Sequence, residues 1–123
     1  MELEVFVNKL CERIVDYIQN GEKPGKLVEY TPAESLSKTT DVSLPIEGNG
    51  TDAVFDDIDE FLRRSVKTNR PEFMNPLWGG LNISGFAGEV VAALTNTSMY
   101  TYELAPFATL IEQAILKRMG ELI

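Results

Sequence analysis

Histidine is absent from the 123 residues, and cysteine occurs once, as Cys11. Without an imidazole the chain cannot hold a histidine general base, a histidine-containing triad or most kinds of zinc site. A single cysteine excludes a disulfide framework within the chain, and its position on the apolar side of a predicted helix leads us to expect a buried thiol. The sequence also contains neither a GxxxxGK[ST] phosphate loop nor a GxGxxG motif.

Positive charge is scarce as well, because 11 basic residues stand against 19 acidic ones and the net charge is −8. A chain this acidic is a poor partner for nucleic acid or for an anionic membrane. No apolar run approaches the roughly 18 residues that a membrane span needs, and the acidic start Met1–Glu4 lacks the basic flank of a signal peptide. We therefore predict a cytoplasmic protein that binds neither nucleic acid nor membrane.

The hydrophobic pattern predicts an all-α chain with about four helices. Apolar residues recur every three or four positions over residues 3–20, about 52–67, about 83–95 and about 102–120. No segment of useful length shows the alternation typical of strands. The expected helix caps are Thr51 for the second helix, Ser98 or Thr101 for the start of the fourth, and Gly120 for its end.

Residues 21–50 are predicted to form one long irregular loop. They carry Pro24, Pro32 and Pro45 together with four glycines, and no helical period continues through them. A loop of about 30 residues is unusual inside a compact domain. The segment is therefore expected to wrap around another body.

Two later segments concentrate side chains that could serve a site. Phe73–Trp78 places large apolar groups in a predicted loop, followed by Gly79 and Gly80. Such groups either bury against a core or form a lip over a ligand, because glycines permit close approach and loops carry sites. Asn96–Glu103 is rich in hydroxyls, which either cap a helix or donate to a ligand.

The stretches Thr68–Asn82 and Leu94–Pro106 resemble the N-terminal region of the group II pyridoxal-phosphate decarboxylases, the glutamate, aspartate and cysteine-sulfinate branch. Family members read similarly to HPRFFNQLSTGLD in the first stretch and to TxNTxMxTYExAP in the second. Ile14–Ile18 and Lys26–Val28 extend the resemblance upstream, so it covers essentially the whole chain. The matching residues are Pro71, Phe73, Asn75, Leu77, Gly80, Leu81, Asn96, Thr97, Met99, Thr101, Tyr102, Glu103, Ala105 and Pro106.

The resemblance implies that residues 1–123 are the N-terminal helical dimerisation and substrate-lip segment of a type I fold decarboxylase. It implies a homodimer, pyridoxal 5'-phosphate as cofactor and an acidic amino acid as substrate. Carried over by position, the residues that line the substrate end of the active site are Asn75, Pro76, Leu77 and Trp78. No catalytic, cofactor-binding or metal-binding residue is carried over to this chain.

Two departures from the family pattern bear on the substrate. Pro76 stands where the family has a glutamine able to hydrogen-bond the substrate, and Trp78 replaces a small polar residue. Proline has no donor, and a tryptophan shortens a pocket. Decarboxylation of glutamate to γ-aminobutyrate therefore has a rival in decarboxylation of aspartate to β-alanine.

The cofactor residues of the family have no counterpart in this sequence. The family places its Schiff-base lysine after a histidine and stacks another histidine on the pyridine ring. None of the six lysines, at 9, 23, 26, 38, 67 and 117, lies in such a motif. We expect the cofactor-binding large domain to be absent from this chain, and the chain alone to bind no cofactor and to be inactive. A free-standing helical interaction module is the alternative of another class.

Overall fold

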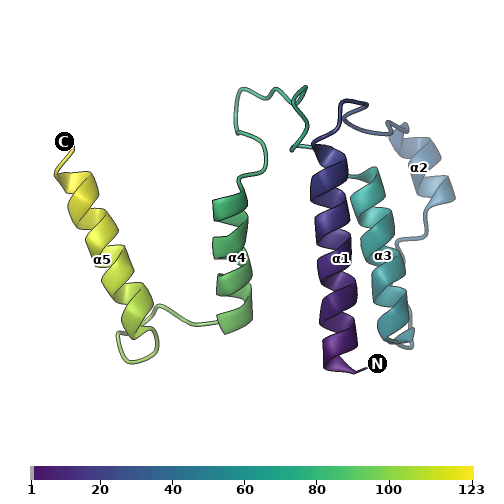
Figure 1. Ribbon diagram of the computed structural model, residues 1–123. Coiled ribbons are helices and arrows are strands. Elements are labelled where there is room, and N and C mark those ends of the chain that lie inside the picture. The colour runs from purple at the N-terminus through teal and green to yellow at the C-terminus, as the bar shows by residue number, and fades with distance from the viewer. Residues whose placement is uncertain (1) are drawn as a thin grey trace. The chain divides into compact units, whose positions relative to one another are not determined.

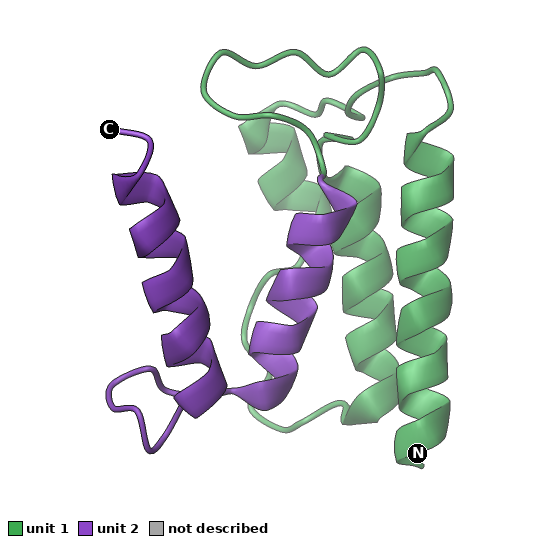
Figure 2. Cartoon of the chain, turned by 60° about the vertical axis from the view of Figure 1, so that its left-hand side comes forward, with its two compact units in different colours: residues 1–81 green, residues 82–123 purple. Residues whose placement is uncertain are grey.

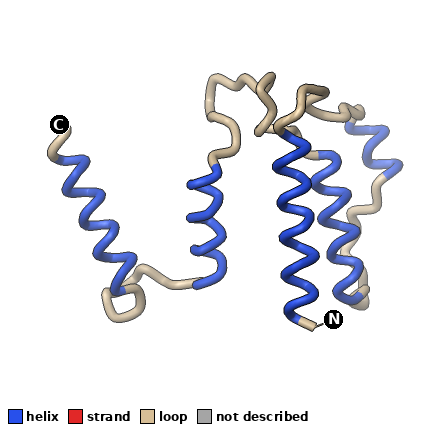
Figure 3. The backbone as a smooth tube through the Cα atoms, viewed as in Figure 1, coloured by secondary structure: helices blue, strands red, loops and turns tan. Residues whose placement is uncertain are grey.

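The computed structural model describes residues 2–123, and the chain divides into two compact units, Met1–Leu81 and Asn82–Ile123 (Figures 1 and 2). All regular structure in the described residues is helical, which confirms the all-α class (Figure 3). The helices are α1 (Leu3–Gly21), α2 (Ala33–Thr39), α3 (Gly50–Arg64), α4 (Ile83–Thr95) and α5 (Pro106–Gly120). None of them is long and apolar enough to cross a lipid bilayer.

The structure has one helix more than the sequence pattern predicts, because α2 interrupts the expected loop over residues 21–50. Its seven residues are too few to show a hydrophobic period. Pro32 directly precedes the helix, a place that proline tolerates because the first N–H groups of a helix have no partner within it. A Lys38–Glu34 pair at 2.6 Å spans one turn of α2.

The core of the first unit is a contact between α1 and α3, which lie side by side (Figure 1). Phe55 of α3 is only 3% exposed, and its ring centroid lies 4.8 Å from that of Phe6 on α1. The guanidinium carbon of Arg13 lies 4.5 Å from the Phe55 centroid, and Lys9 Nζ lies at 5.6 Å. An aromatic pair flanked by two cations therefore joins the helices.

Ion pairs fix the register of this contact. Arg13 donates from Nε and from Nη2 to the two carboxylate oxygens of Asp59, at 2.8 and 2.9 Å. Lys9 Nζ lies 3.3 Å from Asp52. Because the two aspartates are two helical turns apart, they lie on one face of α3. The pairs are largely exposed and contribute modest energy, but the two-pronged arginine contact specifies geometry.

The buried aromatic of α3 differs from the expectation. The apolar period of residues 52–67 runs through Val54, Ile58, Phe61, Leu62, Ser65 and Val66 and predicts that these form the inner face. Instead Phe55 is buried and Phe61 is 73% exposed. The expectation that Cys11 is buried is also wrong, because its side chain is exposed. Residues 6, 10, 14 and 18 give the less exposed stripe of α1, and Cys11 lies outside it.

Several expected caps are also wrong. Asn49 is the N-cap of α3, so Thr51 lies inside that helix. Ala105 precedes α5 without a side-chain cap, so neither Ser98 nor Thr101 caps it, and Glu121 rather than Gly120 follows its last residue. Pro106 opens α5, because proline fits only near the first turn of a helix, so α5 begins four residues after the expected start at residue 102.

We expect Phe55→Ala to destabilise the first unit by about 3 kcal/mol, because it removes the buried ring and leaves a cavity. Phe61→Ala is the matched control, since it removes the same side chain from an exposed position of the same helix. Urea denaturation followed by circular dichroism measures both. Equal losses for the two variants would contradict the packing described above.

Candidate functional site

The loop after α3 docks onto the end of α1. Asn69 Nδ2 donates to the carbonyl of Ile18 at 3.0 Å, which satisfies one of the free carbonyls at the end of a helix. The side chain of Asn69 occupies the space beside Gly21, where any Cβ would overlap it. The backbone N–H of Lys67 donates to the Leu27 carbonyl at 2.7 Å. The loop is therefore anchored on both the helix and the segment that follows it.

The anchored loop supports the segment Phe73–Gly80. Gly80 lies directly against the carbonyl oxygen of Thr68, where a Cβ would overlap backbone. The ring centroids of Phe73 and Trp78 are 5.9 Å apart. Asn75 Oδ1 accepts a hydrogen bond from the N–H of Leu77 at 2.8 Å, which makes a local turn.

This segment encloses an open hollow of about 450 Å³, which we name the lip hollow. Of the predicted substrate-lining residues, Asn75, Pro76 and Trp78 lie in its wall, together with Phe73, Met74, Gly79 and Gly80. Leu77 does not line it and is 85% exposed. Met74 is 89% exposed, so the apolar side chains of this segment do not simply bury against a core.

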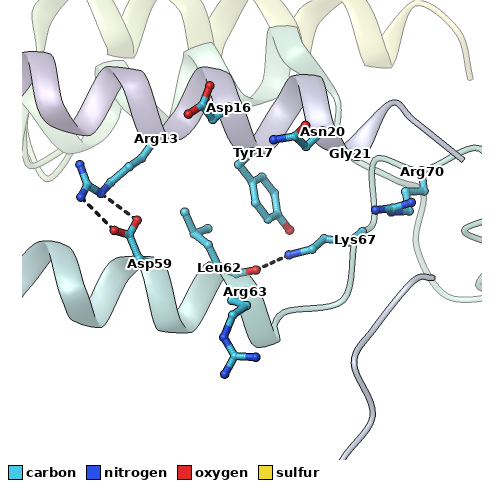
Figure 4. A pocket seen from close by; sticks show the side chains of 10 residues that line it. All are labelled: Arg13, Asp16, Tyr17, Asn20, Gly21, Asp59, Leu62, Arg63, Lys67 and Arg70. Carbon is cyan, nitrogen blue, oxygen red and sulfur yellow. Dashed lines mark hydrogen bonds and ion pairs between the residues drawn. The ribbon is translucent and has the colours of Figure 1, made fainter. Parts of the chain in front are cut away.

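A second hollow, of about 320 Å³, lies between the C-terminal parts of α1 and α3 and the loop that follows α3 (Figure 4). We name it the cationic hollow, after the four basic residues in its wall, Arg13, Arg63, Lys67 and Arg70. The sequence pattern does not predict this hollow. Lys67 and Arg70 lie beyond the end of α3, and only the folding of the loop onto α1 brings them beside Tyr17.

Burial shapes the chemistry of the cationic hollow. Lys67 Nζ donates to the Leu62 carbonyl and lies 4.7 Å from the centroid of the Tyr17 ring. Burial, with a smaller contribution from the nearby Arg70 charge, lowers the pKa of Lys67. Burial also raises the pKa of Tyr17, which favours its protonated hydroxyl. The Tyr17 hydroxyl donates weakly to the Val66 carbonyl, at 3.4 Å.

Comparison with known proteins identifies the family. A family model described as the pyridoxal-dependent decarboxylase conserved domain matches residues 32–123. The chain belongs to the pyridoxal-dependent decarboxylase family. This confirms the family that the two sequence motifs suggested.

Several decarboxylases are similar to the chain over nearly its whole length. Mouse acidic amino acid decarboxylase GADL1 is 32% identical over 98% of the chain, and Drosophila melanogaster glutamate decarboxylase is 30% identical over 99%. Human cysteine sulfinic acid decarboxylase is 34% identical over 98%. The chain spans 22%, 24% and 25% of these three proteins, respectively.

The fold is similar to a solved decarboxylase. The crystal structure of mouse CSAD matches with a TM-score of 0.89 and 31% identity, over 98% of this chain and 26% of the other. The apo form of the same protein matches with a TM-score of 0.90. The chain therefore corresponds to about a quarter of such an enzyme.

The pyridoxal cofactor of the family does not fit the residues of this chain. The cofactor needs a lysine amine, an acid for its ring nitrogen and donors for its phosphate. Lys67, the lysine of the cationic hollow, is directed to the Leu62 carbonyl, and the Asp59 carboxylate there is held by Arg13, so it is not free for the ring nitrogen. The described residues also hold no cluster of three or more acidic or cysteine side chains arranged for a metal ion. We derive no catalytic step from these residues.

We expect Gly80→Ala to disorder the lip hollow, because the new methyl group would meet the Thr68 carbonyl and force the backbone to move. Gly79→Ala is the matched control, since nothing lies within 4 Å of a Cβ there. Trp78, which is the single tryptophan, reports the change by fluorescence. Only the Gly80 variant should shift the emission, and a similar shift in both would contradict the close approach.

Proposed function

We propose that this chain is the N-terminal segment of a pyridoxal-phosphate-dependent carboxy-lyase that acts on an acidic amino acid. The family match carries this proposal. The similar proteins are named for acidic amino acids, glutamate and cysteine sulfinic acid. The leading reaction is the decarboxylation of glutamate to γ-aminobutyrate.

The domain that binds the cofactor is placed outside residues 1–123. The share of the similar decarboxylases that the chain spans, 22–25% of their length, supports this division. When bound, the cofactor supplies the electron sink that decarboxylation at the α-carbon needs. The role proposed for this chain is to hold the substrate lip and to make contacts between subunits.

The proposed substrate lip consists of Asn75, Pro76 and Trp78, which line the lip hollow, with Leu77 between them on its outer side. Because Asn75 Oδ1 accepts from the Leu77 N–H, its amide nitrogen is left to donate to a substrate carboxylate. Pro76 adds no donor, and the Trp78 ring takes up volume beside Phe73. This geometry favours a second candidate, aspartate, because its side chain is one methylene shorter than that of glutamate.

A homodimer is the assembly that fits the exposed apolar surface. In the second unit no large apolar side chain of α4 or α5 is buried. Leu94 is 82% exposed and Phe107 is 75% exposed. Apolar faces of this extent are typical of surfaces that another protein covers, and a two-fold dimer is the commonest solution.

We place the protein in the cytoplasm. The exposed thiol of Cys11 supports this location, because a reducing compartment keeps such a group free. Its single occurrence leaves no partner cysteine within the chain.

The decisive assay uses the complete reading frame that contains this chain. The purified protein with added pyridoxal phosphate should release carbon dioxide from glutamate or aspartate. A folded complete protein that releases none from any acidic amino acid would favour the helical interaction module instead.

We expect Pro76→Gln combined with Trp78→Ser to raise the ratio of kcat/KM for glutamate over aspartate by about tenfold or more. The change adds a donor and frees volume, and one hydrogen bond to a charged group contributes roughly 1.5–3 kcal/mol. The assay is performed with both substrates on the complete protein. If kcat/KM changed by the same factor for glutamate and aspartate, the lip would not discriminate between substrates by the length of their side chains.

We also expect the 123-residue chain to self-associate, because a small chain buries a small fraction of its surface and its exposed apolar faces are unfavourable in water. Light scattering should report a dimer at tens of micromolar, roughly the range in which weak interfaces populate. Phe107→Glu should reduce the dimer, since it places a charge on the exposed apolar surface of α5. A monomer at these concentrations would contradict the homodimer.

A further inference from the structure

The cationic hollow contains two positive charges that have no carboxylate partner in the described part of the chain. Neither Lys67 nor Arg70 belongs to any of the ion pairs there. Both side chains are half-buried. In a chain with a net charge of −8, such cations would be expected to find an acid readily. The lack of a carboxylate partner for Lys67 and Arg70 therefore results from the local fold and not from a shortage of acidic residues.

The nearby acids are engaged elsewhere. Asp59 is held by Arg13, and Glu29 and Glu60 are held by Arg63. Figure 4 shows the Asp16 carboxylate pointing away from the Lys67 amine, across α1. No acid in the wall of the hollow thus neutralises the two cations.

The donors of Arg70 and Lys67 are only partly used. Arg70 Nη1 donates to the Lys23 carbonyl at 2.8 Å, while its Nε is buried without a hydrogen-bond partner. Lys67 has three N–H groups, of which the Leu62 carbonyl takes one. The Tyr17 hydroxyl, weakly engaged, lies beside Lys67 (Figure 4).

Half-buried like charges are unfavourable unless an opposite charge joins them. Burial and the nearby Arg70 charge both lower the pKa of Lys67, and Glu29 opposes them with a smaller contribution. An oxyanion in the hollow would relieve the repulsion and would accept from the N–H groups of Lys67 that the Leu62 carbonyl leaves unused. A phosphate group suits the site better than a carboxylate does, because its two negative charges match the two cations and its oxygens accept from several directions.

We propose that the cationic hollow is a phosphate-binding site, in which Lys67, Arg70 and the Tyr17 hydroxyl hold the phosphate group of a small ligand. The ligand is either inorganic phosphate or a small phosphomonoester. The hollow, at about 320 Å³, has room for the phosphate group and a few further atoms. The site lies on the scaffold formed by α1, α3 and the loop between residues 65 and 70, and ligand binding there would stabilise that scaffold.

The experiment is calorimetric titration of the 123-residue chain with inorganic phosphate at constant ionic strength. Saturable binding of one phosphate is expected. Arg70→Gln keeps a donor for the Lys23 carbonyl but removes the charge, and Lys67→Met keeps an apolar stem on the Tyr17 ring. Each variant should weaken the binding about tenfold, since each removes one charged hydrogen-bond donor.

The matched control is Lys26→Gln, which removes one positive charge from an exposed position outside the hollow. It should bind phosphate as the original chain does. The site would be overturned if the original chain showed no saturable phosphate binding. It would also be overturned if Arg70→Gln and Lys67→Met bound phosphate as tightly as the original chain, or if Lys26→Gln lost as much affinity as they do. Acetate binding as tightly as phosphate would overturn the choice of phosphate.

Two further measurements complete the test. Glycerol phosphate, titrated in parallel, separates the sources: tighter binding than inorganic phosphate indicates a phosphomonoester ligand, and weaker binding indicates the free ion. If a variant fails to fold, NMR of the Arg70 Nε–H resonance in the unaltered chain tests the proposal instead. It should shift on phosphate addition, and an unchanged resonance would overturn the proposal.

Discussion

The contact between Phe55 and α1 is the constraint on which the rest of the first unit depends. Phe55 and Ala105, each 3% exposed, are the two hydrophobic residues that are buried in the described part of the chain. Phe6 and Arg13 cover the Phe55 ring, and the pairing of Arg13 with Asp59 sets how far α1 can slide along α3. A unit of this size has little other core to hold its helices. The cation that closes the core therefore also fixes its register.

From this helix pair the loops acquire their positions. The end of α1 offers its carbonyl at Ile18 to Asn69, and the end of α3 leads directly into the same loop. The loop carries Lys67 and Arg70 into one hollow and presents the Thr68 carbonyl to Gly80. One packing contact thus positions two hollows of different character: an apolar lip and a cationic site.

Sequence patterns predicted what depends on neighbours along the chain. The bounds of α1 and α4 and the position of Pro106 at the start of α5 agree with expectation to within a residue. Features set by contacts between distant segments were missed. The burial of Phe55 depends on where α1 packs, and the hollow at Lys67 depends on a loop that folds back on α1. The resemblance implied Asn75, Pro76, Leu77 and Trp78 as substrate-lining residues. Asn75, Pro76 and Trp78 line the lip hollow and Leu77 does not, and substrate contact by any of them stays a prediction.

The central claim is that these 123 residues serve as scaffold and lip and that the cofactor is held elsewhere. The most direct measurement is borohydride reduction of the 123-residue chain mixed with pyridoxal phosphate, followed by mass spectrometry that locates any modified lysine. The account predicts no stoichiometric lysine adduct, because the Lys67 amine is directed to the Leu62 carbonyl. A stoichiometric adduct on one lysine, Lys67 above all, would contradict it.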